Sequence, residues 1–185
     1  MLAANPAAYL DAAHSLYERA DSLTDRLAAL RWITHYEAVE KREAVLADFY
    51  SRWQHEALVV NQWLTVQATR PEVDCVDSVR ALMTHPAFDW RNPNKLRALI
   101  GAFAGANPIA FHREDGAGYR LMGEVIERLQ ASNPQIAARM LAPMTRWRRY
   151  AVGQEAMRGE LERLAAIDAL PVSYTHLTLP TKRIV

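Results

Sequence analysis

The sequence has little of several features that would mark common classes of protein. Its 185 residues include one cysteine, Cys75, so no internal disulfide can form, and a single thiol fits a reducing compartment such as the cytoplasm. Lys and Arg total 22 against 21 Asp and Glu, and a net charge of +1 does not favour nucleic acid or an anionic membrane as partner. No apolar run approaches the roughly 20 residues that cross a bilayer, and the first residues lack the basic start and apolar core of a secretory signal. We therefore expect a cytoplasmic protein that binds neither nucleic acid nor membrane.

Motifs for catalysis within the chain are also missing. His55-Glu56 could open an HExxH zinc motif, but Val59 stands where the second histidine is needed. The other histidines have no metal-ligand spacing, and there is no Gly-rich phosphate loop or Gly-x-Ser-x-Gly elbow. We therefore predict no catalytic residue, no metal ligand and no cofactor held by this chain.

What is present is a series of helical patterns. Leu46, Phe49, Tyr50 and Trp53 fall at the i, i+3, i+4, i+7 spacing of one helix face. Asn-Pro pairs recur at residues 5, 92, 107 and 133, and each is a helix-start signal because Asn can accept a bond from a free N–H while Pro has none to satisfy. Ser22 and Asp25 have capping-box spacing.

These patterns predict an all-α fold. The apolar segment 59–68 indicates a buried helix, although its Val-Val pair leaves a strand open. About ten helices joined by short loops are typical of an irregular α-solenoid of armadillo or HEAT type, without a clean sequence repeat.

Three polar residues near helix starts are candidate ligand contacts. Arg97 and Arg139 each lie one turn into a helix that begins at an Asn-Pro pair, where a guanidinium could grip a carboxylate; Gln135 could bond a peptide amide. The alternative for Arg97 is that it is merely exposed or pairs with Glu72 or Asp77. Arg139 could likewise be merely exposed or ion-paired, and Gln135 could simply face solvent.

Two further polar clusters have structural interpretations. His112 with Glu114 and Asp115 indicates an ion-pair turn rather than a general base. Arg146, Arg148 and Arg149 around Trp147 resemble a nucleic-acid patch, but a charged helix end explains them better at a net charge near zero.

Longer runs of this sequence closely resemble the C-terminal helical domain of bacterial aminopeptidase N, the HExxH zinc-dependent alanyl aminopeptidases. The resemblance covers about residues 9–170 and is carried by these stretches: ADSLTD (20–25), RWQH (52–55), Trp63-Leu64, QAT (67–69), NPNKLRALIGAF (92–103), Asn107-Pro108, Phe111-His112, EDG (114–116), Gly118-Tyr119, NPQ (133–135) and Arg139.

The resemblance implies a role for the chain. In that family the helical domain closes over the active site and lines a chamber for the peptide, while zinc, the general base and the amine-binding carboxylates belong to other domains. Arg97, Gln135 and Arg139 match family positions that face bound peptide. The expected partners are thus a peptide substrate and a catalytic domain that this sequence does not include, with zinc in the full-length parent only.

The two ends of the chain complete the expectations. We expect residues 1–171 to form the helical domain, truncated at both ends, and residues 172–185, which resemble sequencing-adapter read-through, to be a non-native tail. Without the family's next helix, Leu161, Leu164 and Leu170 would be exposed. The alternative function is a stand-alone helical-repeat adaptor that binds peptides.

Overall fold

The fold is helical throughout the part of the chain that the structure describes, residues 6–167 of a computed structural model, and no strand occurs in that range. The elements, in chain order, are α1 (Pro6–Arg19), α2 (Leu23–Tyr36), α3 (Val39–Trp53), α4 (Ala57–Ala68), α5 (Cys75–Leu82), α6 (Pro93–Leu96), the π-helical segment η1 (Arg97–Gly101), α7 (Ala102–Ala106), α8 (Pro108–Phe111), α9 (Ala117–Gln130), α10 (Pro134–Met140), the 3₁₀ segment η2 (Met144–Arg149) and α11 (Gln154–Ala165). The predicted all-α class is confirmed.

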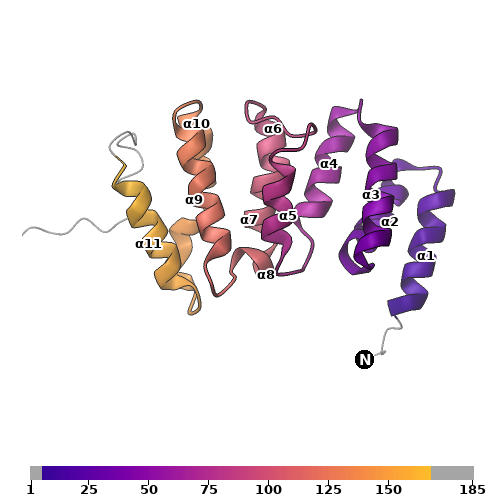
Figure 1. The fold of residues 1–185 in the computed structure, drawn as a ribbon, viewed down its shortest axis with the longest axis horizontal. Coiled ribbons are helices and arrows are strands. Elements are labelled where there is room, and N and C mark those ends of the chain that lie inside the picture. The colour runs from indigo at the N-terminus through magenta and orange to yellow at the C-terminus, as the bar shows by residue number, and fades with distance from the viewer. Residues whose placement is uncertain (1–5, 168–185) are drawn as a thin grey trace, which may run out of the picture.

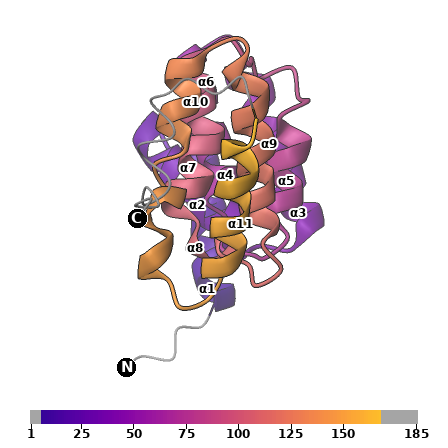
Figure 2. The ribbon, with the colours of Figure 1, turned by 90° about the vertical axis from the view of Figure 1, so that its left-hand side faces the viewer.

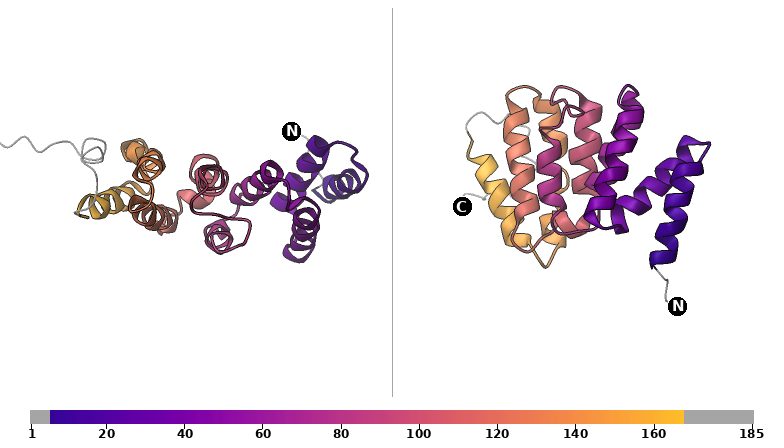
Figure 3. Two further views of the ribbon diagram at one scale, coloured as in Figure 1. Left: turned by 90° about the horizontal axis from the view of Figure 1, so that it is seen from above. Right: turned by 45° about the vertical axis from the view of Figure 1, so that its right-hand side comes forward.

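The helices are arranged in two rows that run along the long axis of the molecule (Figure 1). We call α3, α5, α9 and α11 the first row, and α2, α4, the continuous α6–η1–α7 and α10 the second row; the view from above in Figure 3 separates them, and α1 closes the N-terminal end against α2. Figure 2, along the axis, places α6, α7 and α10 on one side and α3, α5 and α9 on the other. Consecutive antiparallel helices stacked in this way form the predicted α-solenoid.

The sequence signals for helix starts are confirmed. The side chain of Asn92 accepts bonds from the N–H groups of Asn94 and Lys95, Asn107 accepts from Ala110 and Asn133 from Ile136, each with Pro at the first helical position. Ser22 accepts from the Asp25 N–H at 3.1 Å. The pair at residues 5–6 lies at the edge of the described range, and nothing is inferred from it.

The core lies between the two rows and is continuous along the solenoid. Phe49 from the first row and Leu64 and Phe103 from the second are fully buried, and Trp63 donates its indole N–H to the Leu46 carbonyl at 3.0 Å. Segment 59–68 is a helix and not a strand, because α4 packs against α2, α3, α5 and η1 and buries most of its circumference. Cys75 is buried as a free thiol.

Residues 70–74 form a turn held by the Arg70 guanidinium, so α5 begins only at Cys75. One expectation about the C-terminal end is corrected. Leu161 and Leu164 are buried rather than exposed, since α11 packs against α9 and η2. Leu170 and the predicted tail 172–185 lie outside the described residues.

Candidate functional site

Charge is distributed unequally between the two rows. Helices α4, α6, α7 and α10 and the segments η1 and η2 contain no Asp or Glu, and α2 contains only Asp25. The first-row helices α3, α5, α9 and α11 each contain at least one acidic residue. A near-zero net charge therefore conceals a basic second row, which would attract an anionic ligand.

The arginines of the first row are engaged by its carboxylates. Every arginine of α3, α5 and α11 is in an ion pair: Arg52 with Asp48, Arg80 with Glu124, Arg163 with Glu127 and Glu160, and likewise Arg42 and Arg158. In the second row and η2, no arginine forms an ion pair with any of residues 6–167. The two arginines of α9 have no carboxylate partner among the described residues: Arg120 donates to the Asp115 carbonyl, and Arg128 lies over the Trp90 ring. The arginines without any such partner are therefore concentrated in the second row.

Arg97 is the first residue of the π-helical segment. It is exposed, and its Nη1 donates to Asn94 Oδ1 at 3.2 Å; the pairing with Glu72 or Asp77 that the sequence left open is not made. Asn92 caps this helix, and buried Leu96 and Leu99 fix it against the core. π-Helical turns occur often at functional sites. The helix that bears Arg97 is fixed against the core, and the only partner of the guanidinium among the described residues is the neutral Asn94 side chain, so the Arg97 charge remains available to a ligand.

Gln135 and Arg139 lie four residues apart on α10, so they share one helix face. Both are exposed, and neither side chain has a hydrogen bond or ion pair with another of the described residues. Ala137 on the opposite face is fully buried against the solenoid, where α10 packs on α9. The structure thus places all three predicted residues, Arg97, Gln135 and Arg139, in acid-free helices of the second row, exposed to solvent.

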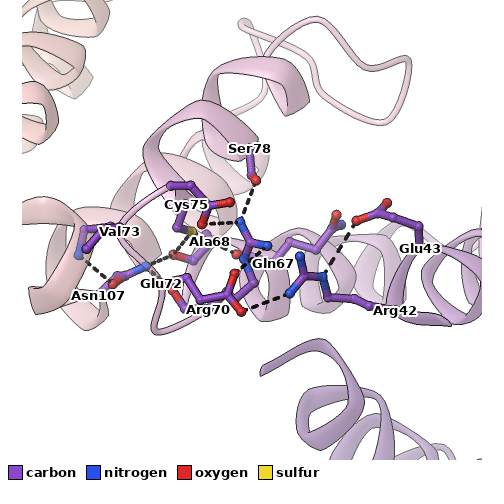
Figure 4. A network of polar contacts seen from close by, with 12 residues as sticks. Arg42, Glu43, Gln67, Ala68, Arg70, Glu72, Val73, Cys75, Ser78 and Asn107 are labelled. Carbon is purple, nitrogen blue, oxygen red and sulfur yellow. Dashed lines mark hydrogen bonds and ion pairs between the residues drawn. The ribbon is translucent and has the colours of Figure 1, made fainter. Parts of the chain in front are cut away.

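A separate polar network ties α3 to the turn before α5 (Figure 4). Arg42 and Arg70, only 3% and 4% exposed, share the Glu72 carboxylate at 3.1 and 3.0 Å, and Arg70 also reaches Asp74 and Ser78. A pocket of about 210 Å³ adjoins the two guanidinium groups. Three carboxylates, counting Glu43 at 3.9 Å, already surround two arginines there, so this network holds the fold together rather than attracting an anion.

The predicted ion-pair turn at His112 is wrong. His112 Nδ1 lies 2.9 Å from the Tyr119 hydroxyl, and its ring contacts the Tyr150 ring with centroids 4.1 Å apart, while Asp115 pairs with Arg113 instead. Gly116 in the left-handed conformation reverses the loop and brings the start of α9 beneath His112. Burial lowers the pKa of His112 below its ordinary value. A structural role for this histidine remains the best account.

Within residues 6–167 no group of three His, Cys, Asp or Glu residues is arranged to hold a metal ion, and no helix in that range is long and apolar enough to cross a bilayer. Burial lowers the pKa of Lys95, beside Arg97 in the second row. The second row therefore offers guanidinium groups that can bind an anion and an amide group that can hydrogen-bond a peptide.

Comparison with known proteins agrees with this arrangement. Residues 1–174 match a family described as a domain of unknown function (DUF3458_C) with ARM repeats. The chain belongs to this family. The armadillo-like solenoid predicted from the sequence is the architecture that the family's description names.

Relatives with curated names are aminopeptidases. The chain is 44% identical over 155 residues to aminopeptidase N of Haemophilus influenzae and 41% identical to that of Escherichia coli, which covers 83% of this chain and 18% of each relative. The solved structure of Legionella pneumophila aminopeptidase A in complex with aspartic acid is similar with a TM-score of 0.84 and 30% identity over 91% of this chain and 20% of that one. The resemblance to aminopeptidase N is confirmed, and this DUF3458_C chain spans about a fifth of the length of these relatives.

Proposed function

We propose that this chain is the C-terminal helical domain of a zinc-dependent alanyl aminopeptidase, and that its second row lines the chamber that holds the peptide beyond the bond to be cut. The observation that carries the proposal is the segregation of charge. Arg97 and Arg139 stand exposed in acid-free helices, whereas the arginines of α3, α5 and α11 are paired with carboxylates. The aminopeptidase relatives supply the reaction class.

The described residues do not fit a zinc ion themselves, since they include no suitable group of ligands. The metal and the residues that cleave the peptide bond would therefore belong to the part of the enzyme that this chain does not span. The task of this chain is to bind and orient. Each of Arg97 and Arg139 can donate two parallel bonds to a carboxylate or to peptide carbonyls, and Gln135 can pair with a backbone amide.

Contacts beyond the bond to be cut should affect the kcat/KM of long substrates more than that of short ones. In the intact enzyme, Arg97→Ala removes a charge-assisted contact worth about 1.5–3 kcal/mol, which is about 10- to 150-fold in kcat/KM for a tripeptide. An alanine chromogenic amide does not extend to Arg97, so its kcat/KM should change little. Equal losses for both substrates would contradict the assigned role.

A matched control is available in the first row. Arg52 is also an exposed arginine, but it is paired with Asp48 on α3, so Arg52→Ala should leave the kcat/KM of both substrates unchanged. The purified 185-residue chain alone should neither bind zinc stoichiometrically nor hydrolyse the amide. The stand-alone adaptor is the rival proposal; a zinc domain in frame upstream of Met1 would exclude it, and a stop codon and promoter there would support it.

A further inference from the structure

The second row contains a further basic feature beyond Arg97 and α10. A pocket of about 290 Å³ lies between α2 and α4, the two helices that precede η1 along this row. Its lining includes both polar and apolar side chains: Thr24, Leu27, Arg31, Trp32, Gln62 and Val66. None of these lining residues is a candidate site residue by sequence motif or by resemblance.

Arg31 is the only ionisable side chain of this lining. It is exposed, and it forms no ion pair or hydrogen bond with any other residue between 6 and 167. Helix α4 has no acidic residue, and Asp25 of α2 is six positions away, which places it about 240° around the helix from Arg31. The Gln62 amide of α4 and the Thr24 hydroxyl of α2 add uncharged hydrogen-bonding groups to the lining.

We propose that this pocket, which we call the Arg31 pocket, binds a carboxylate of a peptide whose preceding residues lie along α4 and η1. The proposal rests on the proposed peptide-binding function of the second row. A planar guanidinium is suited to a carboxylate because it donates two parallel bonds, and Trp32 and Leu27 give an apolar wall for the residue that bears the carboxylate.

The spacing of the helices sets the length of peptide that can contact both Arg97 and the Arg31 pocket. Helix α2 packs on α4 and α4 packs on η1. Two interaxial steps of roughly 8–10 Å give about 16–20 Å between the axes of α2 and η1, so a peptide that contacts both Arg31 and Arg97 needs at least about five or six extended residues at roughly 3.3 Å each. Tripeptides would reach Arg97 only, and longer peptides would also reach the Arg31 pocket.

The carboxylate can come from a peptide C-terminus or from an acidic side chain, and binding to the 185-residue chain distinguishes the two. Calorimetric titration at low salt would compare a six-residue Ala-Gly peptide as free acid, the same peptide as C-terminal amide, and an amide with Asp as the last residue. We expect the free acid to bind at least 5-fold tighter than the plain amide. A gain of similar size for the Asp-containing amide assigns the pocket to carboxylates in general, and no gain restricts it to C-termini.

The variants Arg31→Gln, Arg97→Gln and Arg52→Gln separate the two proposals. Arg31→Gln should abolish the preference for acid over amide, whereas Arg97→Gln should weaken both peptides, and Arg52→Gln, in the ion-paired first row, should change neither. An unchanged acid-to-amide ratio in Arg31→Gln, with both peptides weakened by Arg97→Gln, would overturn the Arg31 pocket and leave the peptide-binding function standing. Failure of the wild-type chain to bind any of these peptides would overturn both.

Two readouts locate the carboxylate. The NMR signals of the Trp32 indole N–H and the Gln62 amide should shift with the free acid and not in Arg31→Gln, and the buried Gln130 amide of α9 serves as internal reference. A single-stranded DNA oligonucleotide is the control for general anion attraction. If it bound more tightly than every peptide and lost affinity in Arg31→Gln, the pocket would be part of a nucleic-acid surface and the carboxylate assignment would be wrong.

Discussion

Two of the Asn-Pro caps have the same sequence signal and different surroundings, which allows a strong prediction. Asn107 is 2% exposed; it accepts from the Ala110 N–H at 3.1 Å, and its Nδ2 donates to the carbonyls of Ala68 at 3.0 Å and Arg70 at 2.7 Å. Asn133 is half-buried and accepts from the Ile136 N–H alone. Asn107 therefore joins α8 to the end of α4, while Asn133 caps only its own helix.

The expected losses follow from these bonds. Asn133→Ala removes a cap worth about 1 kcal/mol. Asn107→Ala removes a buried cap and the two hydrogen bonds to the carbonyls of Ala68 and Arg70. Each of these bonds counts for only about 1 kcal/mol, because the Ala68 carbonyl keeps Cys75 as a partner and the Arg70 carbonyl keeps the Glu72 N–H. The total expected loss is about 3 kcal/mol. Urea unfolding of the 185-residue chain at pH 7, followed by far-ultraviolet circular dichroism, measures both free energies of unfolding.

Aspartate at the same positions tests the donor half of the argument. Asn133→Asp keeps the acceptor and places a negative charge at a helix start, so the free energy of unfolding should stay within about 0.5 kcal/mol of the wild type. Asn107→Asp turns a donor into a buried carboxylate oxygen facing two carbonyl oxygens, and it should destabilise at least as much as Asn107→Ala. Equal effects of each substitution at the two positions would refute the reasoning.

Two other predictions concern pH and close packing. Burial lowers the pKa of His35, His85 and His112 in the folded chain, so as the pH falls the unfolded chain takes up protons before the folded chain does. The free energy of unfolding should therefore be at its plateau above about pH 6.5 and fall towards pH 5. Equal urea midpoints at pH 7 and 5.5 would contradict this. Gly118→Ala should destabilise the chain by about 2 kcal/mol, because the new Cβ would lie 2.8 Å from carbon atoms of the Phe111 backbone. Gly105→Ala, where a Cβ has no atom within 4 Å, should be neutral or stabilise by under about 1 kcal/mol. A similar change in the free energy of unfolding for both variants would count against the packing.

The sequence predicted what depends on local chemistry. The Asn-Pro starts, the Ser22 cap and the apolar stripe of α3 are read from residues within one or two turns, and the structure confirms them. The partners of His112 were predicted wrongly, because they depend on distant elements: His112 contacts Tyr119 and Tyr150. For Arg97, the structure shows the exposed state that the sequence had left open, with a hydrogen bond to Asn94. The π-helical turn after Leu96 was not foreseen either, because nothing in its composition distinguishes it from the α-helix on both sides.

The charge segregation had a visible signal that sequence reasoning missed. Segments 57–68, 93–112 and 134–149 contain no Asp or Glu, and they alternate with segments rich in both signs. Alternating helices of a solenoid belong to opposite rows, so this pattern already indicates one basic face. Net charge alone concealed it. Which arginines remain unpaired, and that Arg31 lines a pocket, required the structure.

The most direct test of the account is to map a bound peptide on the 185-residue chain. Backbone amide shifts would be recorded while a six-residue free-acid peptide is added at low salt. We expect the largest changes in the second row, in α2 around Arg31, in α4 and in the α6–η1 segment around Arg97. Changes confined to the first row, in α3, α5 and α9, would contradict the claim that the second row holds the peptide.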